Sequence, residues 1–122
     1  MLKMASIAFG VVFLLAGVLG FVPGITTNEM MLGIFHVNVA HNVVHLLSGA
    51  VALIAGLTST AYARIYFRVF GVVYALVAAL GFYVGNGMLL GLISNNMADV
   101  WLHAVIALVA LWLGFMAKDK TA

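Results

Sequence analysis

The chain has 122 residues, of which 66% are apolar and only 7% are charged, and it contains no Cys. A water-soluble domain carries about 25% charged residues, so this composition excludes a soluble globular domain, a disordered chain and a disulfide framework. The net charge is +2, but no run of Lys and Arg could follow a phosphate backbone, which excludes nucleic-acid binding.

Four apolar stretches are each long enough to cross a bilayer as a helix, which takes about 20 residues. In chain order they are residues 4–22, 39–57, 65–84 and 99–117. Pro, Gly, Thr, Ser and Asn separate them and are typical of turns. Because these runs are too long for barrel strands, the sequence predicts an all-α protein, a four-helix transmembrane bundle that forms a single domain over residues 1–122. Helices of this kind are expected to contact the lipid bilayer on their Leu, Val and Ile faces.

The cations indicate how the bundle is oriented, because loops that are translocated near a span are poor in Lys and Arg. With four spans, every Lys and Arg falls on one side: Lys3, Arg64, Arg68, Lys118 and Lys120. We therefore predict a multi-pass protein of the bacterial inner membrane with both termini in the cytoplasm. Aromatic residues near the span ends are expected to anchor at the interface: Tyr62, Tyr66, Tyr83, Trp101 and Trp112.

The chain also contains an internal duplication. FGVVFLLAGVLGFVPG, residues 9–24, and FGVVYALVAALGFYVG, residues 70–85, are identical at more than half of their positions. The second and fourth spans match as well, so that His45 aligns with His103 and Gly56 with Gly114. We interpret the chain as two tandem helical hairpins, repeat 1 over residues 1–60 and repeat 2 over residues 61–118. A retained copy of the first span argues against a cleaved signal peptide, the competing interpretation.

Both hairpins begin on the same side, so they form a parallel repeat about an axis along the membrane normal. This symmetry predicts that the second and fourth spans lie across from each other, with His45 and His103 at equal depth. Polar and small residues on these two spans recur at steps of three or four and predict buried helix contacts. The stripes are Asn38, His41, His45, Gly49, Ala52 and Gly56 on one span, and Asn96, Asp99, His103, Ala107, Ala110 and Gly114 on the other.

Two runs carry a resemblance to a known family. FHVNVAHNVVHLLSG contains the motif His-Asn-x-x-His-Leu, and NNMADVWLHAVIALVALWLG contains Asp-x-x-Leu-His. Together they resemble the signatures of a bacterial family of four-span integral membrane proteins that is known as a domain of unknown function. The resemblance implies the same four-helix membrane fold and brings no activity, substrate or cofactor with it.

Our main hypothesis for the polar residues is a structural network near the outer face. Its members are Asn38, His41, Asn42, His45, Asn96, Asp99 and His103. Hydrogen bonds between membrane helices contribute about 0.6 kcal/mol on average, so several could set the register of the hairpins. We expect His45 and His103 to bond to each other, to Ser48 or to Asn42. Asp99 is expected to cap the fourth helix and to pair with His41. On this hypothesis the protein is a structural or accessory subunit, as a homo-oligomer or within a membrane complex.

The alternative is a cofactor site, because neutral imidazole is a common ligand of haem iron and of transition metals. His45 and His103 could clamp a haem from both sides. Equally, His41, His45, His103 and Asp99 could surround a divalent ion such as zinc, cobalt or nickel. A quinone, lipid or proton role for the same residues also stays open. The sequence has no motif for an activated nucleophile or an acid-base pair, so we expect no enzyme activity.

Overall fold

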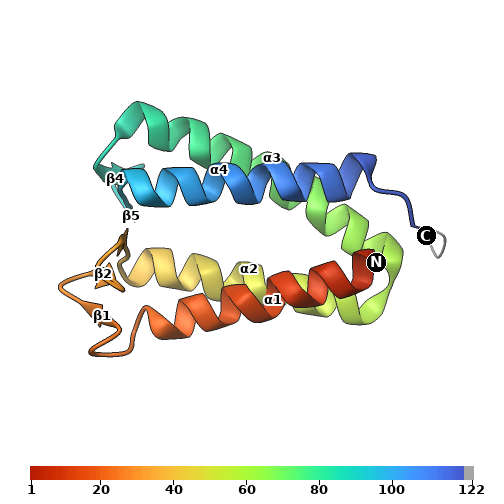
Figure 1. The fold of residues 1–122 in the computed structure, drawn as a ribbon, viewed down its shortest axis with the longest axis horizontal. Coiled ribbons are helices and arrows are strands. Elements are labelled where there is room, and N and C mark those ends of the chain that lie inside the picture. The colour runs from red at the N-terminus through yellow and green to blue at the C-terminus, as the bar shows by residue number, and fades with distance from the viewer. Residues whose placement is uncertain (120–122) are drawn as a thin grey trace.

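The computed structural model describes residues 1–119, so Lys120 lies outside the described residues. Four helices account for most of these residues (Figure 1). They are α1 (Leu2–Leu19), α2 (Val39–Thr58), α3 (Thr60–Val84) and α4 (Met97–Leu111), and α4 continues into a π-helical turn, η1 (Trp112–Met116). All four are long and apolar enough to cross a membrane. The four-helix transmembrane bundle predicted from the sequence is therefore confirmed, and the protein is a multi-pass membrane protein.

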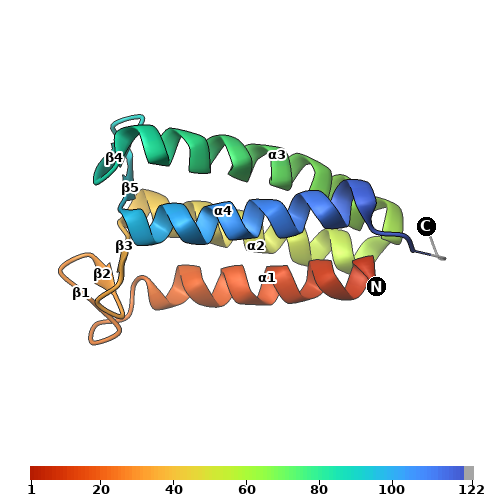
Figure 2. The same cartoon turned by 45° about the horizontal axis from the view of Figure 1, so that its top comes forward.

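The helices run side by side, with the start of α1 and the end of α4 at one end of the bundle and the loops that carry strands at the other (Figures 1 and 2). Large apolar side chains dominate the outer surface, including Leu15, Val51, Leu76 and Leu108. Because apolar surface of this extent needs an apolar solvent, these faces contact lipid acyl chains.

Some helices begin or end at residues other than those predicted, because a capping residue sets the boundary. Only Ser59 separates α2 from α3, and its Oγ accepts a hydrogen bond from the backbone N–H of Tyr62 at 3.1 Å. This N-cap allows α3 to begin at Thr60, earlier than the predicted residue 65. Tyr66 is consequently well inside the helix, where it is buried and its hydroxyl donates to the carbonyl oxygen of Ser48 at 3.3 Å. The prediction that Tyr66 anchors the protein at the interface is therefore wrong.

The last helix ends in a π-helical turn that the sequence did not predict. The backbone N–H of Ala117 donates to the carbonyl oxygen of Trp112 at 2.8 Å, a bond one residue longer than in an α-helix. The carbonyl oxygen of Gly114 instead accepts from Arg64 Nη1 at 3.2 Å and Arg68 Nε at 2.7 Å. The two arginines thus bind the wider turn and tie the end of α4 to the start of α3.

The loops between helices form short antiparallel sheets, which the sequence also did not predict. The first contains β1 (Thr26–Thr27), β2 (Met30–Met31) and β3 (Phe35–His36) in that order, and the second pairs β4 (Gly87–Leu89) with β5 (Ile93–Asn95). A Leu-Gly turn with positive φ at both residues closes β2–β3 and β4–β5, with φ of 55° at Leu32 and 54° at Leu90. A type I′ turn of this kind suits the twist of a tight hairpin.

Within each hairpin, the two helices pack through glycines at equivalent positions of the repeat. A Cβ atom added at Gly10 would lie 2.7 Å from the backbone nitrogen of Leu53, and one at Gly71 would lie 3.0 Å from that of Leu111. Gly56 and Gly114 likewise lie against the backbone of Ile7 and Arg68. Because these pairs correspond under the predicted repeat, α1 packs on α2 in the same way as α3 packs on α4.

Aromatic rings fill the space between the hairpins. Phe13 lies 5.3 Å from Phe70 and 5.8 Å from Tyr74, measured between ring centroids, and Phe9 lies 5.0 Å from Phe67. Most of these pairs meet edge to face, the geometry that aromatic quadrupoles favour. This aromatic layer lies next to the buried histidines, on their side away from the loops.

Candidate metal centre

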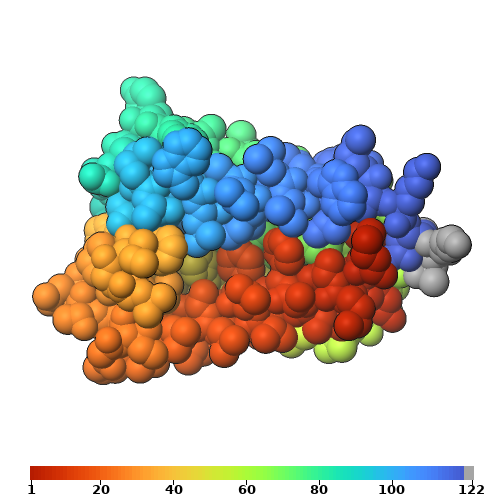
Figure 3. All heavy atoms as spheres, viewed as in Figure 1, coloured from red at the N-terminus to blue at the C-terminus, as the bar shows by residue number. Residues whose placement is uncertain are grey.

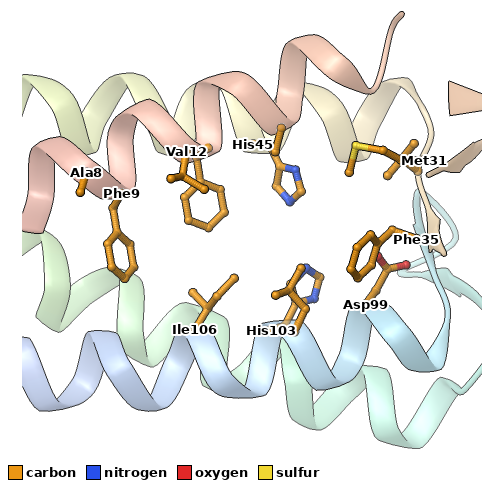
Figure 4. A pocket seen from close by; sticks show the side chains of 13 residues that line it. Ala8, Phe9, Val12, Met31, Phe35, His45, Asp99, His103 and Ile106 are labelled. Atoms are coloured by element: carbon orange, nitrogen blue, oxygen red, sulfur yellow. The ribbon is translucent and has the colours of Figure 1, made fainter. Parts of the chain in front are cut away.

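Three histidines come together between α2 and α4. His41, His45 and His103 are all buried, with exposed fractions of 2%, 6% and 4%. One ligand nitrogen from each lies within 4.8 Å of the other two. His45 and His103 each follow the first residue of their helix by six positions, which places both about 9 Å along it. Figure 4 shows their rings pointing into the same cavity from opposite helices, as the predicted symmetry required.

Aromatic side chains pack against the rings of His45 and His103. Phe13 packs edge to face on His45 with centroids 5.4 Å apart, and Tyr74 packs in the same way on His103 at 5.2 Å. Phe13 and Tyr74 occupy equivalent positions of the repeat. The two histidines are therefore held at matched positions by matched neighbours, which restricts how far either ring can turn.

Two of the imidazoles carry a nitrogen that nothing in the described chain satisfies. Nδ1 of His45 and Nδ1 of His103 are buried, and neither has a hydrogen-bond partner among residues 1–119. The expected bonds from these atoms to each other, to Ser48 or to Asn42 are thus not formed. Leaving a buried polar atom unpaired costs about 1–3 kcal/mol, so a bound ligand that engages these rings would offset a real penalty.

Ser94 lies beside Nδ1 of His41 and favours one tautomer of its ring. The Ser94 hydroxyl donates its single proton to the carbonyl oxygen of His36 at 3.0 Å. Its oxygen lies 3.5 Å from Nδ1 of His41 and can therefore only accept there. With the Ser94 proton directed to His36, the ring proton of His41 belongs on Nδ1, and the Nε2 lone pair is available. Metal-bound histidines are commonly oriented in this way by a partner on the other ring nitrogen.

Asn38 and Asn96 cross-link the two hairpins by a reciprocal exchange. Nδ2 of Asn38 donates to the carbonyl oxygen of Leu92, and Nδ2 of Asn96 donates to that of Ile34, each at 3.0 Å. The two bonds relate equivalent positions of the repeat. They join each helix start to the loop of the other hairpin and so fix the relative position of α2 and α4.

The same two asparagines cap their helices. Oδ1 of Asn38 accepts from the backbone N–H of His41 at 2.9 Å, and Oδ1 of Asn96 accepts from that of Asp99 at 3.0 Å. Asp99 completes a capping box by accepting the backbone N–H of Asn96 at 3.0 Å. Asp99 therefore takes part in the cap, but the capping residue is Asn96, and the Asp99 carboxylate accepts the amide of Asn96 and not those of the first turn as predicted. The predicted pairing of Asp99 with His41 is not formed within residues 1–119, and Asp99 lies outside the group of three imidazoles.

Asn42 and His36 stand apart from the cluster. The side-chain amide of Asn42 is buried against Gly20, which follows the end of α1, and a Cβ added at Gly20 would collide with it. His36 is half-buried in β3 and its Nε2 lies 3.2 Å from a carboxylate oxygen of Glu29. Of the seven residues predicted to form one polar network, the three histidines form one group. Asn38, Asn96 and Asp99 bind backbone groups at the starts of α2 and α4, and Asn42 lies against Gly20.

A cavity of about 390 Å³ opens beside the histidines, between α1 and α4. His45, His103 and Asp99 lie on its wall toward the loops, and Phe9, Val12, Phe13, Leu102 and Ile106 are among its apolar residues. Figure 4 shows several of these side chains around an open space, and Figure 3 shows the hollow between the two helices at the surface. His45 and His103 therefore face an apolar space that opens toward the membrane.

The sequence did not indicate Ser94 or the cavity. Ser94 is the repeat partner of His36, which marks it as a loop position and does not reveal its contact with His41. The cavity arises from the spacing between α1 and α4, which are far apart in the chain. No sequence pattern within either helix reports that distance.

Three neutral imidazoles with an open fourth position form the ligand set of a catalytic-type zinc site, and they also suit copper, nickel and cobalt. Bonds of about 2.0–2.1 Å place tetrahedral ligand nitrogens roughly 3.4 Å apart, so small rotations of the rings would close the site. Haem fits less well. The His41 ring lies 4.5 Å from that of His45 and 5.7 Å from that of His103, in the space where the plane of a porphyrin held between them would pass.

Comparison with known proteins adds the family and no activity. No curated protein and no solved structure matches the chain. A family model matches residues 3–116, which is nearly the whole chain. The protein therefore belongs to the family described as domain of unknown function DUF4383.

Proposed function

We propose that this protein binds one divalent transition-metal ion inside the membrane through His41, His45 and His103. The observation that carries the proposal is the group of three buried imidazoles whose ligand atoms lie within 4.8 Å of one another. Magnesium and calcium prefer oxygen ligands, whereas imidazole favours zinc, copper, nickel and cobalt. The unpartnered Nδ1 atoms of His45 and His103 add support, because a purely structural histidine pair would be expected to use them.

The division of the polar residues favours this function over a purely structural network. Asn38, Asn96 and Asp99 satisfy backbone groups at the helix starts and loops. Among residues 1–119, the bundle is therefore cross-linked without any hydrogen bond from His45 or His103. We propose a metal-binding accessory subunit, because the sequence carries no motif of an activated nucleophile or acid-base pair.

We further propose that the site lies near the outer face of a bacterial inner membrane, with both termini in the cytoplasm. Four cations lie at the end of the bundle that holds the chain termini: Lys3, Arg64, Arg68 and Lys118. Glu29 lies in a loop at the opposite end. The positive-inside rule supports this orientation. Metal would then reach the histidines from the periplasmic side.

The test is a metal analysis of the protein purified in mild detergent, followed by titration of the metal-free protein with Co²⁺. We expect one ion per chain and visible absorption bands typical of tetrahedral cobalt. His45→Ala and His103→Ala should each weaken binding at least as much as the roughly 10–100-fold loss that follows removal of an outer-shell partner.

His36→Ala is the matched control, since His36 lies outside the cluster and should leave affinity unchanged. Absence of stoichiometric binding by the unmodified protein would overturn the proposal. So would an equal loss in His36→Ala and His45→Ala, or an intense Soret band, which would identify haem.

A further inference from the structure

We infer that the cavity between α1 and α4 binds a long-chain lipid carboxylate whose head group occupies the open position on the metal. The inference rests on the proposed metal site and adds the class of its partner ligand. Three features support it: the size and apolar lining of the cavity, its opening toward lipid and the net charge of the proposed metal site.

The cavity has the size and lining of a site for an apolar molecule. Its volume of about 390 Å³ lies within the roughly 300–1,000 Å³ of ligand pockets. Ala8, Val12 and Leu102 lie on its wall and are exposed on the surface of the bundle. Because this surface contacts acyl chains, the cavity opens sideways into the hydrocarbon, and a molecule dissolved in the membrane could enter between α1 and α4 (Figure 3).

The net positive charge of the proposed metal site favours an anionic ligand. A divalent ion on three neutral imidazoles has a charge of +2, and the Asp99 carboxylate, which accepts a backbone N–H at the positive end of α4, supplies one negative charge. One positive charge would remain uncompensated among apolar residues, which is costly in a membrane. A monoanionic head group balances it, whereas a neutral quinone or alcohol does not.

The position of the head group favours a small carboxylate over a phospholipid. The two facing histidines lie about 9 Å from the helix starts, and Met31, Phe35 and Val37 line the end of the cavity nearest the loops. A phosphodiester at the membrane surface would have to pass these residues. A fatty acid that has lost its proton at the membrane surface can enter sideways from the acyl chains, and its carboxylate oxygen then binds the metal.

The repeat supplies a built-in comparison. A depression of about 500 Å³ lies between α2 and α3, at the position that the symmetry relates to the cavity. Val73 and Tyr74 replace Val12 and Phe13 on its wall, and within the described part of the chain no histidine or carboxylate lines it. A lipid that binds only because a groove is apolar should use both sites equally.

The experiment follows the visible spectrum of the Co²⁺-loaded protein in detergent. We expect palmitate to shift the cobalt bands with saturation at one molecule per chain, and methyl palmitate and acetate to have no effect at the same concentration. Coupling of the two ligands should tighten Co²⁺ binding by roughly 5–150-fold. Val12→Trp, which fills the cavity, should bind Co²⁺ and lose the palmitate response, whereas Val73→Trp should keep both.

Each outcome is decisive. If the unmodified protein does not bind Co²⁺, the metal site and this inference both fail. If it binds Co²⁺ but acetate, methyl palmitate or phosphatidylglycerol acts as well as palmitate, only this inference is overturned, as it is if Val73→Trp loses the response too. Ile106→Phe is a second cavity-filling variant in case Val12→Trp does not fold, and retention of the palmitate response by the folded variant would refute the assignment of the cavity.

Discussion

Ser94 offers the sharpest test of how the histidines are oriented. It is 1% exposed, and its hydroxyl links the carbonyl oxygen of His36 to Nδ1 of His41. In Ser94→Ala, Nδ1 of His41 loses the hydroxyl beside it, so the ring can turn or move its proton to Nε2. We therefore expect Ser94→Ala to bind metal more weakly although no metal ligand has been changed.

The size of the effect follows from the contact. Loss of an outer-shell partner lowers metal affinity by about 10–100-fold, which corresponds to roughly 1.4–2.8 kcal/mol. The distance from Ser94 Oγ to His41 Nδ1 is long for a hydrogen bond at 3.5 Å, so we expect a loss near 10-fold. Loss of the hydrogen bond from Ser94 to the carbonyl oxygen of His36 should also lower the free energy of unfolding by about 0.5–1.5 kcal/mol.

Competition titration with Co²⁺ measures the affinity, and thermal unfolding in detergent measures the stability. Ser94→Thr retains a hydroxyl and should recover most of the affinity. Thr26→Val is the matched control, because Thr26 Oγ1 also donates to a backbone carbonyl, that of Leu19 at 2.9 Å, but does so away from the histidines. Unchanged affinity in Ser94→Ala, or an equal loss in Thr26→Val, would refute the assigned orientation of His41.

Three further predictions concern the fold. Gly10→Ala should destabilise the bundle by about 1–3 kcal/mol, because its Cβ would lie 2.7 Å from a backbone nitrogen, whereas Gly87→Ala, with its nearest neighbour at 3.5 Å, should have little effect; equal unfolding free energies would contradict the glycine packing. Asn38→Ala and Asn96→Ala should each cost about 0.5–2 kcal/mol through the lost cap, measured by the same assay, and two neutral variants would show that the exchange between hairpins is not stabilising. Because the chain has no Cys, Leu90→Cys provides a single thiol that should react with an impermeant reagent added outside intact cells, and labelling only after lysis would reverse the proposed topology.

Prediction of the site from the sequence was partial for a physical reason. The repeat placed His45 and His103 opposite each other, because equal spacing in two copies of one hairpin gives equal depth in the membrane. It also led us to treat seven polar residues as one network. The structure separates them, since Asn38 and Asn96 turn toward the loops of the opposite hairpin, and Asn42 turns toward α1.

The sequence by itself determined the class of this protein, its four spans and the pairing of its two halves. These properties depend on the length of apolar runs and on their repetition, which are local and additive along the chain. Tertiary structure alone decided the contact of Ser94 with His41, the exclusion of Asp99 from the imidazole group and the cavity beside them. Each depends on distances between segments remote in the chain, where Ser94 meets His41 and α1 stands apart from α4, and such distances are set by how all the side chains pack together.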